Sequence, residues 1–165
     1  MPEKKTLERA RRDKREGKSA STQAGEFVKE QIDKIRRGKH GARNTKQAIA
    51  IGLSEARRAG VDLPPPRKGK KSTRKSARYA YEVGQGKRKA KRRPKVSRAV
   101  ENVLKKEPRK AASRKALSRQ AKSAARRRSA SDRSAAARKA ARTKGAAKRS
   151  AAAKKAARTR ARKRA

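Results

Sequence analysis

The stretch TQAGEFVKEQIDKIRRGKHGARNTKQAIAIGLSEARRAG, residues 22–60, decides the fold, because it holds all four isoleucines and the only phenylalanine of the chain. Its first half carries apolar side chains at helical spacing, with one aromatic ring beside the row: Ala24, Val28, Ile32, Ile35 and Phe27. This spacing predicts an amphipathic helix over about 22–37. Gly38 and Gly41 follow it and supply a stop.

The second half of the stretch predicts another helix, from Asn44 to about Ala59. Asn44 is suited to cap the first turn, and Gln47 stands at the reciprocal capping-box position. The apolar stripe of this helix comprises Ile49, Leu53 and Ala56. Gly52 lies inside it, where the lack of a side chain lets a neighbouring helix approach closely. The two helices are therefore expected to form an antiparallel hairpin.

A further helix over about 6–15 is expected to pack across this hairpin, and Val61 and Leu63 are suited to cover its open end. Helical modules below about 70 to 80 residues are marginally stable without a staple, a metal or a partner. We therefore expect a homodimer through the apolar stripes of the N-terminal helices.

Three consecutive prolines, Pro64–Pro66, impose an extended spacer and divide the chain. The prediction is a small helical domain at 1–66, a basic linker region with short helices at 67–108, and a tail at 109–165. In fold class this is an all-α small helical module, a helix-turn-helix hairpin, followed by a largely disordered basic region and tail.

The composition explains why disorder is expected outside the first module. The chain has 165 residues with 57 Lys and Arg against 13 Asp and Glu, a net charge of +44, and only 16 Val, Ile, Leu and Phe. Few apolar residues with a high net charge are typical of disordered chains. The sequence has no Cys and one His, so neither a disulfide framework nor a metal or cofactor site is expected. No apolar run is long enough for a membrane span or an export signal, which predicts a cytoplasmic location.

The tail, 109–165, is the most basic region. It holds 23 Lys and Arg, 21 Ala and one acid, Asp132. The segment 134–144 recurs sixteen residues later at 150–160 with only Lys/Arg exchanges, and a looser copy lies at 118–128. The copies keep the positions of the positive charges, whether Lys or Arg supplies them. This pattern suits contacts to phosphates rather than recognition of particular bases.

We therefore predict sequence-independent binding of DNA through its phosphates, by a tail that is a coil when free and becomes helical on DNA. The predicted contact residues are Arg109, Lys110, Arg114, Lys115, Arg119, Lys122, Arg126, Arg127, Arg128, Arg138, Lys139, Arg142, Lys144, Lys148, Arg149, Lys154, Lys155, Arg158, Arg160, Arg162, Lys163 and Arg164.

Other functions are weighed beside this one. A charged tail can serve as a solubilising arm, but a net charge of roughly 2 to 8 is enough for solubility in a small domain. An RNA-binding or ribosome-associated protein would use the same polycationic chemistry. An adaptor that tethers a protein partner or granule to the nucleoid is a further alternative. An enzyme is not expected: Glu26, Glu30 and Asp33 each have a cation within helical reach, and His40 lies in the interhelical turn.

Two resemblances support these expectations. The Ala/Lys/Arg tail, with AAAKKAA at 151–157, resembles the C-terminal domain of linker histones and of bacterial histone-like proteins, which implies DNA binding and compaction in a nucleoid. The segments STQAGEFV at 21–28, GKHGARNTKQAIAIG at 38–52 and AGVDLPPP at 59–66 resemble a family of small bacterial proteins whose domain has no assigned function. That likeness implies a bacterial cytoplasmic protein.

Overall fold

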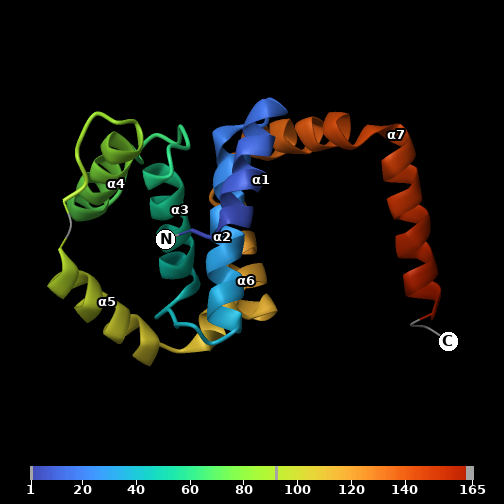
Figure 1. The fold of residues 1–165 in the computed structure, drawn as a ribbon. Helices are drawn as coiled ribbons and strands as arrows, with labels where there is room; N and C mark the ends of the chain where they lie inside the picture. Colours follow the sequence, from blue (N-terminus) through green and yellow to red (C-terminus); the bar gives the residue numbers. More distant parts are fainter. Residues whose placement is uncertain (1, 92, 163–165) are drawn as a thin grey trace. The chain divides into compact units, whose positions relative to one another are not determined.

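The computed structural model describes residues 2–91 and 93–162, except for the side chains of Thr143, Lys144 and Lys148. The helices in chain order are α1 (Lys4–Arg15), α2 (Ala20–Arg36), α3 (Thr45–Arg58), α4 (Lys71–Gly84), α5 (Pro94–Lys106), the short 3-10 helix η1 (Arg109–Ala112), α6 (Arg114–Arg126) and α7 (Ala130–Arg162) (Figure 1). The chain divides into two units, residues 1–120 and 121–165. The class of the protein is therefore all-α.

The predicted hairpin of α2 and α3 is confirmed, and it organises the first unit. Phe27 and Ile35 of α2 are the largest fully buried side chains. At Gly52 of α3 the two helices come so close that an added Cβ would lie 2.6 Å from the Cα of Val28. The close approach expected at this glycine is therefore present.

The flanking elements complete the core as expected. Ala10 of α1 and Val61 join the buried cluster around Phe27, and Leu63 packs against it. The Asn44 side chain accepts a hydrogen bond from the Gln47 backbone N–H at 2.9 Å, which confirms the cap. Gln47 departs from the capping-box expectation, because its side chain accepts from the N–H of Arg43 rather than from that of Asn44.

The expectation of a largely disordered basic region and tail was wrong. The short helices expected within 67–108 are present as α4 and α5, but the tail, expected to be disordered, continues as η1, α6 and α7 nearly to the C-terminus. The physical reason is helix propensity: Ala, Arg and Lys are among the strongest helix formers. Like charges four residues apart oppose this by only about 0.2–0.5 kcal/mol per pair. The coil expected for the free tail is therefore not what the chain adopts.

The first residues of the tail also pack into the core of the first unit. Ala111 and Ala112 of η1 are buried with Ile35 in a second cluster, and Leu117 of α6 lies against it. Thr45 donates a hydrogen bond to the carbonyl of Ala111 at 2.8 Å. The start of the tail is thus part of the folded module rather than an arm that leaves it.

Candidate nucleic-acid interface

The structure distributes the predicted DNA-contacting cations over four consecutive parts of the chain. Arg109 and Lys110 lie in η1; Arg114, Lys115, Arg119, Lys122 and Arg126 in α6; Arg127 and Arg128 in the connection; Arg138, Lys139, Arg142, Lys144, Lys148, Arg149, Lys154, Lys155, Arg158, Arg160 and Arg162 in α7. The side chains of Lys144 and Lys148 are outside the described part, as are Lys163 and Arg164 altogether. These cations form a series of helical faces and not one convergent pocket.

On α6 the cations share one face. Lys115, Arg119, Lys122 and Arg126 follow one another at steps of four, three and four residues, which aligns them along a helix. All four are exposed, while Leu117 lies on the opposite side and packs against the core. In the part of α6 that belongs to the first unit, Lys115 and Arg119 thus face away from the core that Leu117 contacts.

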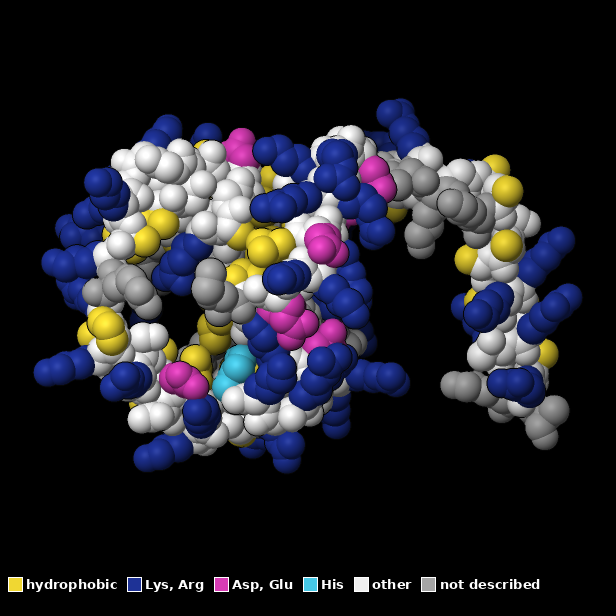
Figure 2. Space-filling model, in the orientation of Figure 1, with side chains coloured by type: hydrophobic (Ala, Val, Ile, Leu, Met, Phe, Trp, Pro, Cys, Tyr) yellow, Lys and Arg dark blue, Asp and Glu magenta, His cyan; other side chains and the backbone are white. Residues whose placement is uncertain are grey.

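On α7 the cations stand in exposed pairs one helical turn apart. Arg138 and Arg142 form one pair, and Lys154 and Arg158 form the corresponding pair sixteen residues later. The face of this segment shown in Figure 2 displays Lys and Arg among small apolar side chains. Asp132, the one acid of the tail, lies in the first turn of α7, where a negative charge stabilises the helix dipole.

A second positive surface was not predicted from the sequence. Pro64–Pro66 and the N-terminal half of α4 line an open groove of about 610 Å³, with Arg67, Lys71, Arg74, Lys75 and Arg78 around it. The spacing of the four α4 cations, at i, i+3, i+4 and i+7, marks one helical face in the sequence. Only the fold shows that the prolines lie beside that face.

The side chains of Arg57 and Tyr81 fix the segments that form this groove. The guanidinium of Arg57 donates to the carbonyls of Leu63 at 3.0 Å and Pro64 at 3.3 Å, which fastens the proline segment to α3. The Tyr81 hydroxyl donates to Asp62 at 2.6 Å, and this hydrogen bond raises the pKa of Tyr81. The Tyr81 hydroxyl thus links α4 to the segment that precedes the prolines.

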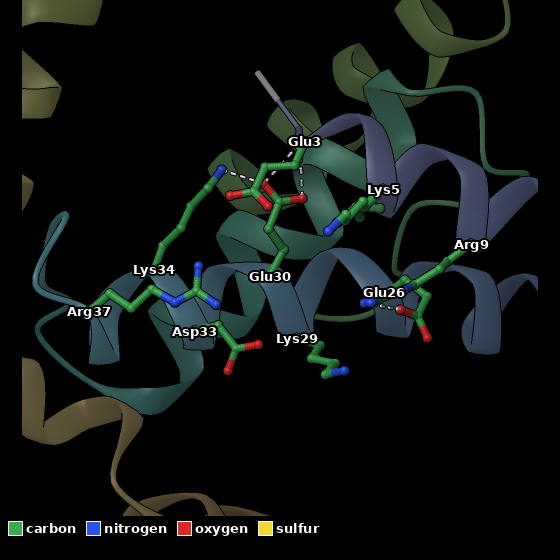
Figure 3. A pocket seen from close by; sticks show the side chains of 10 residues that line it. Glu3, Lys5, Arg9, Glu26, Lys29, Glu30, Asp33, Lys34 and Arg37 are labelled. Atoms are coloured by element: carbon green, nitrogen blue, oxygen red, sulfur yellow. Dashed lines mark hydrogen bonds and ion pairs between the residues drawn. The ribbon is translucent and has the colours of Figure 1, made fainter.

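The acidic residues of α2 are ion-paired: Glu30 and Asp33 with cations of the same helix, as predicted, and Glu26 with a cation of α1. Figure 3 shows the pairs of Glu30 and Glu26. Lys34 pairs with Glu30, which is buried, and the backbone N–H of Glu3 donates to the same carboxylate at 3.1 Å. Burial alone would raise the pKa of Glu30, but the hydrogen bonds from Lys34, Thr6 and Glu3 hold that pKa below its ordinary value. This cluster fastens the start of α1 to α2, which is a structural task.

Two other cations neutralise the neighbouring acids. Glu26 pairs with Arg9 at 3.6 Å, and Asp33 pairs with Arg36 at 3.9 Å. His40 is half-buried in the α2–α3 turn, where one ring nitrogen lies 3.1 Å from the Gln31 side chain. Within residues 2–91 and 93–162, no group of three or more His, Cys, Asp or Glu side chains is placed to hold a metal ion.

Searches for similar proteins give one match. No curated protein and no solved structure matches the chain. Over the described residues, none of the helices combines the length and the apolar character that crossing a membrane requires. The histone-like resemblance of the tail has no counterpart in these comparisons and stays a prediction. Residues 11–71, which run from the middle of α1 to the start of α4, match the model of a family of unknown function (DUF6496), and a domain of that family therefore occupies this part of the chain.

Proposed function

We propose that this chain is a non-enzymatic, histone-like protein of the bacterial nucleoid, which binds DNA through its phosphates without reading the sequence and compacts it. The proposal rests on the row of exposed cation pairs on α6 and α7, in a tail that contains only one acidic residue, Asp132. Lys and Arg side chains that neutralise phosphates release counterions, and this release supplies most of the free energy of non-specific binding.

The charge of the tail also limits how one molecule can act. A duplex carries one phosphate charge per about 1.7 Å of its axis. A helix advances about 1.5 Å per residue, so a straight helix of 57 residues would span the length of roughly 50 phosphates. With 23 cations, the tail neutralises less than half of them. Compaction therefore requires several molecules, or several duplex segments gathered by one molecule.

A salt titration on the full chain tests the proposal. In one variant, six tail cations in corresponding pairs are replaced by Gln: Lys122, Arg126, Arg138, Arg142, Lys154 and Arg158. A matched control replaces six exposed cations of the N-terminal helices, so that both variants lose the same charge: Lys4, Arg11, Arg15, Lys29, Lys46 and Arg58.

The slope of log K against log salt should fall by about 5 in the tail variant, at about 0.9 per lost phosphate contact. The slope should fall much less in the control variant, because its replaced cations lie outside the proposed interface. Equal losses in the two variants would refute a tail-specific interface. Competition with an RNA duplex of the same sequence separates the alternatives, since tighter binding to RNA would favour the RNA-binding reading.

A further inference from the structure

The breaks in the tail helices recur with the same period as its sequence repeat. Ser113 and Ser129 cap α6 and α7: their hydroxyls accept from the backbone N–H groups of Ala116 at 3.2 Å and Asp132 at 3.0 Å. Sixteen residues beyond Ser129, Gly145 has φ 66° and ψ 166°, which interrupts α7 and changes its direction (Figure 1). Each copy of the repeat therefore lies in one short helix. The residue in front of that helix, Ser113, Ser129 or Gly145, also ends the preceding helical segment.

Without these breaks, successive cation pairs would face different sides of one helix. The pairs Lys122/Arg126, Arg138/Arg142 and Lys154/Arg158 occupy the same place in the three copies. Sixteen residues make about 4.4 helical turns, so in an unbroken helix each pair would be rotated by about 160° from the one before. Successive pairs would then lie on opposite sides, and only alternate pairs could face one duplex.

The length of each segment suits a partner whose surface curves. Fifteen residues of helix span about 22 Å. That is roughly two thirds of one turn of B-form DNA, which is about 34 Å long. The major groove of B-DNA is about 12 Å wide and admits an α-helix, whereas the deep, narrow major groove of A-form RNA does not admit side chains. A long straight helix would leave the groove as the duplex turns, while short segments can follow it.

We propose that each sixteen-residue copy is a separate DNA-docking helix, and that the breaks at Ser129 and Gly145 let successive cation pairs face the phosphates of one B-form duplex. This inference rests on the proposed function and adds to it the form of the ligand and the role of the breaks. Ser129 and Gly145 are positioning residues: they act through the direction of the helices and not by contact with DNA.

A substitution that changes no charge tests the proposal on the full chain. Gly145→Ala should join the two halves of α7, because side chains rarely adopt a φ of 66° and Ala is the strongest helix former. A second variant carries Gly145→Ala and two additional alanines directly after it. The spacing between the pairs Arg138/Arg142 and Lys154/Arg158 then becomes eighteen residues, or five full turns, so both pairs return to one face of the helix. Gly17→Ala is the matched control, since Gly17 has the same φ of 66° with nothing within 4 Å of an added Cβ.

The measured quantity is the slope of log K against log salt for binding to a labelled B-form duplex. An RNA duplex of the same sequence is measured in parallel. Gly145→Ala should lower the slope by about 2, the loss of one cation pair, and the two added alanines should restore it. Gly17→Ala should leave it unchanged. An unchanged slope in Gly145→Ala, a loss that the added alanines do not restore, or an equal loss on the RNA duplex would each overturn the proposal. A parent chain that shows no salt-dependent DNA binding would instead refute the proposed function itself.

Discussion

Gly52 offers the sharpest test of how the module is packed. The change is Gly52→Ala in α3. An added Cβ would lie 2.6 Å from the Cα and 2.8 Å from the N of Val28, both of them backbone atoms of α2. Ordinary contact begins near 3.4 Å, so α3 must move away from α2 by about 0.8 Å, a distance that no side-chain rotation can supply. Overpacking of this kind costs about 1–3 kcal/mol, and a clash between backbones belongs at the upper end.

The helix propensity of alanine offsets part of this cost, by about 1 kcal/mol relative to glycine. We therefore expect Gly52→Ala to lower the free energy of unfolding by about 2 kcal/mol. Gly25→Ala is the internal control, because Gly25 also lies within a helix, α2, and nothing is within 4 Å of its added Cβ. That variant should raise the free energy of unfolding by about 1 kcal/mol.

Urea unfolding followed by far-UV circular dichroism measures both values. The tail helices should lose their circular dichroism signal gradually with urea. The cooperative transition therefore measures the unfolding of the N-terminal module. The two variants should differ by about 3 kcal/mol, in opposite directions from the parent chain. If Gly52→Ala were as stable as Gly25→Ala, α2 and α3 would not meet at this residue and the packing described above would be wrong.

Three further predictions concern stability. Ile35→Ala, which empties a fully buried position, should lower the free energy of unfolding by about 2–5 kcal/mol in the same urea assay, and a loss below about 1 kcal/mol would contradict its place in the core. Because the folded pKa of Glu30 is lowered, its stabilising contribution is present above the ordinary glutamate pKa of 4.5 and is lost as the pH falls through the folded pKa. The parent chain should therefore exceed Glu30→Gln in stability at pH 7, with the difference shrinking in acid; a difference independent of pH would refute the role of the carboxylate. Added salt should raise the melting temperature of the free chain, because it screens the self-repulsion of a +44 protein, while it weakens DNA binding; a melting temperature that falls with salt would show that ion pairs outweigh the repulsion.

Periodicity was sufficient to predict the hairpin. The apolar spacing around Phe27 and Ile35 places α2, and the Asn44 cap places the start of α3, because both depend on neighbouring residues alone. The apolar stripes expected to offer a dimer interface are largely buried within one chain, although dimerisation itself stays a prediction. The docking of η1 could not be predicted, since its contacts join residues far apart in sequence: Arg36 donates to the carbonyl of Ala112 across 76 positions.

The tail prediction was wrong because composition was given more weight than local propensity. A low content of large apolar residues excludes a packed core, and it does exclude one for α7, whose described side chains are almost all exposed. It does not exclude an exposed helix, which needs no core when most of its residues are Ala, Lys and Arg. The groove beside α4 was missed for a different reason, because its proline wall is brought there by the contacts of Arg57.

A tail that is already helical changes how the proposed binding to DNA should proceed. A disordered segment that folds on its ligand loses conformational freedom at that moment, and part of the interaction free energy is spent on ordering it. In α6 and α7 the backbone is ordered beforehand, so more of the free energy of phosphate contact remains as affinity. The helical path is interrupted at Ser129, which caps α7, and at Gly145, where the backbone leaves the helical conformation. Rigid segments with few breaks combine a low ordering cost with the ability to follow a curved polyanion, and neither a random coil nor a single straight helix provides both.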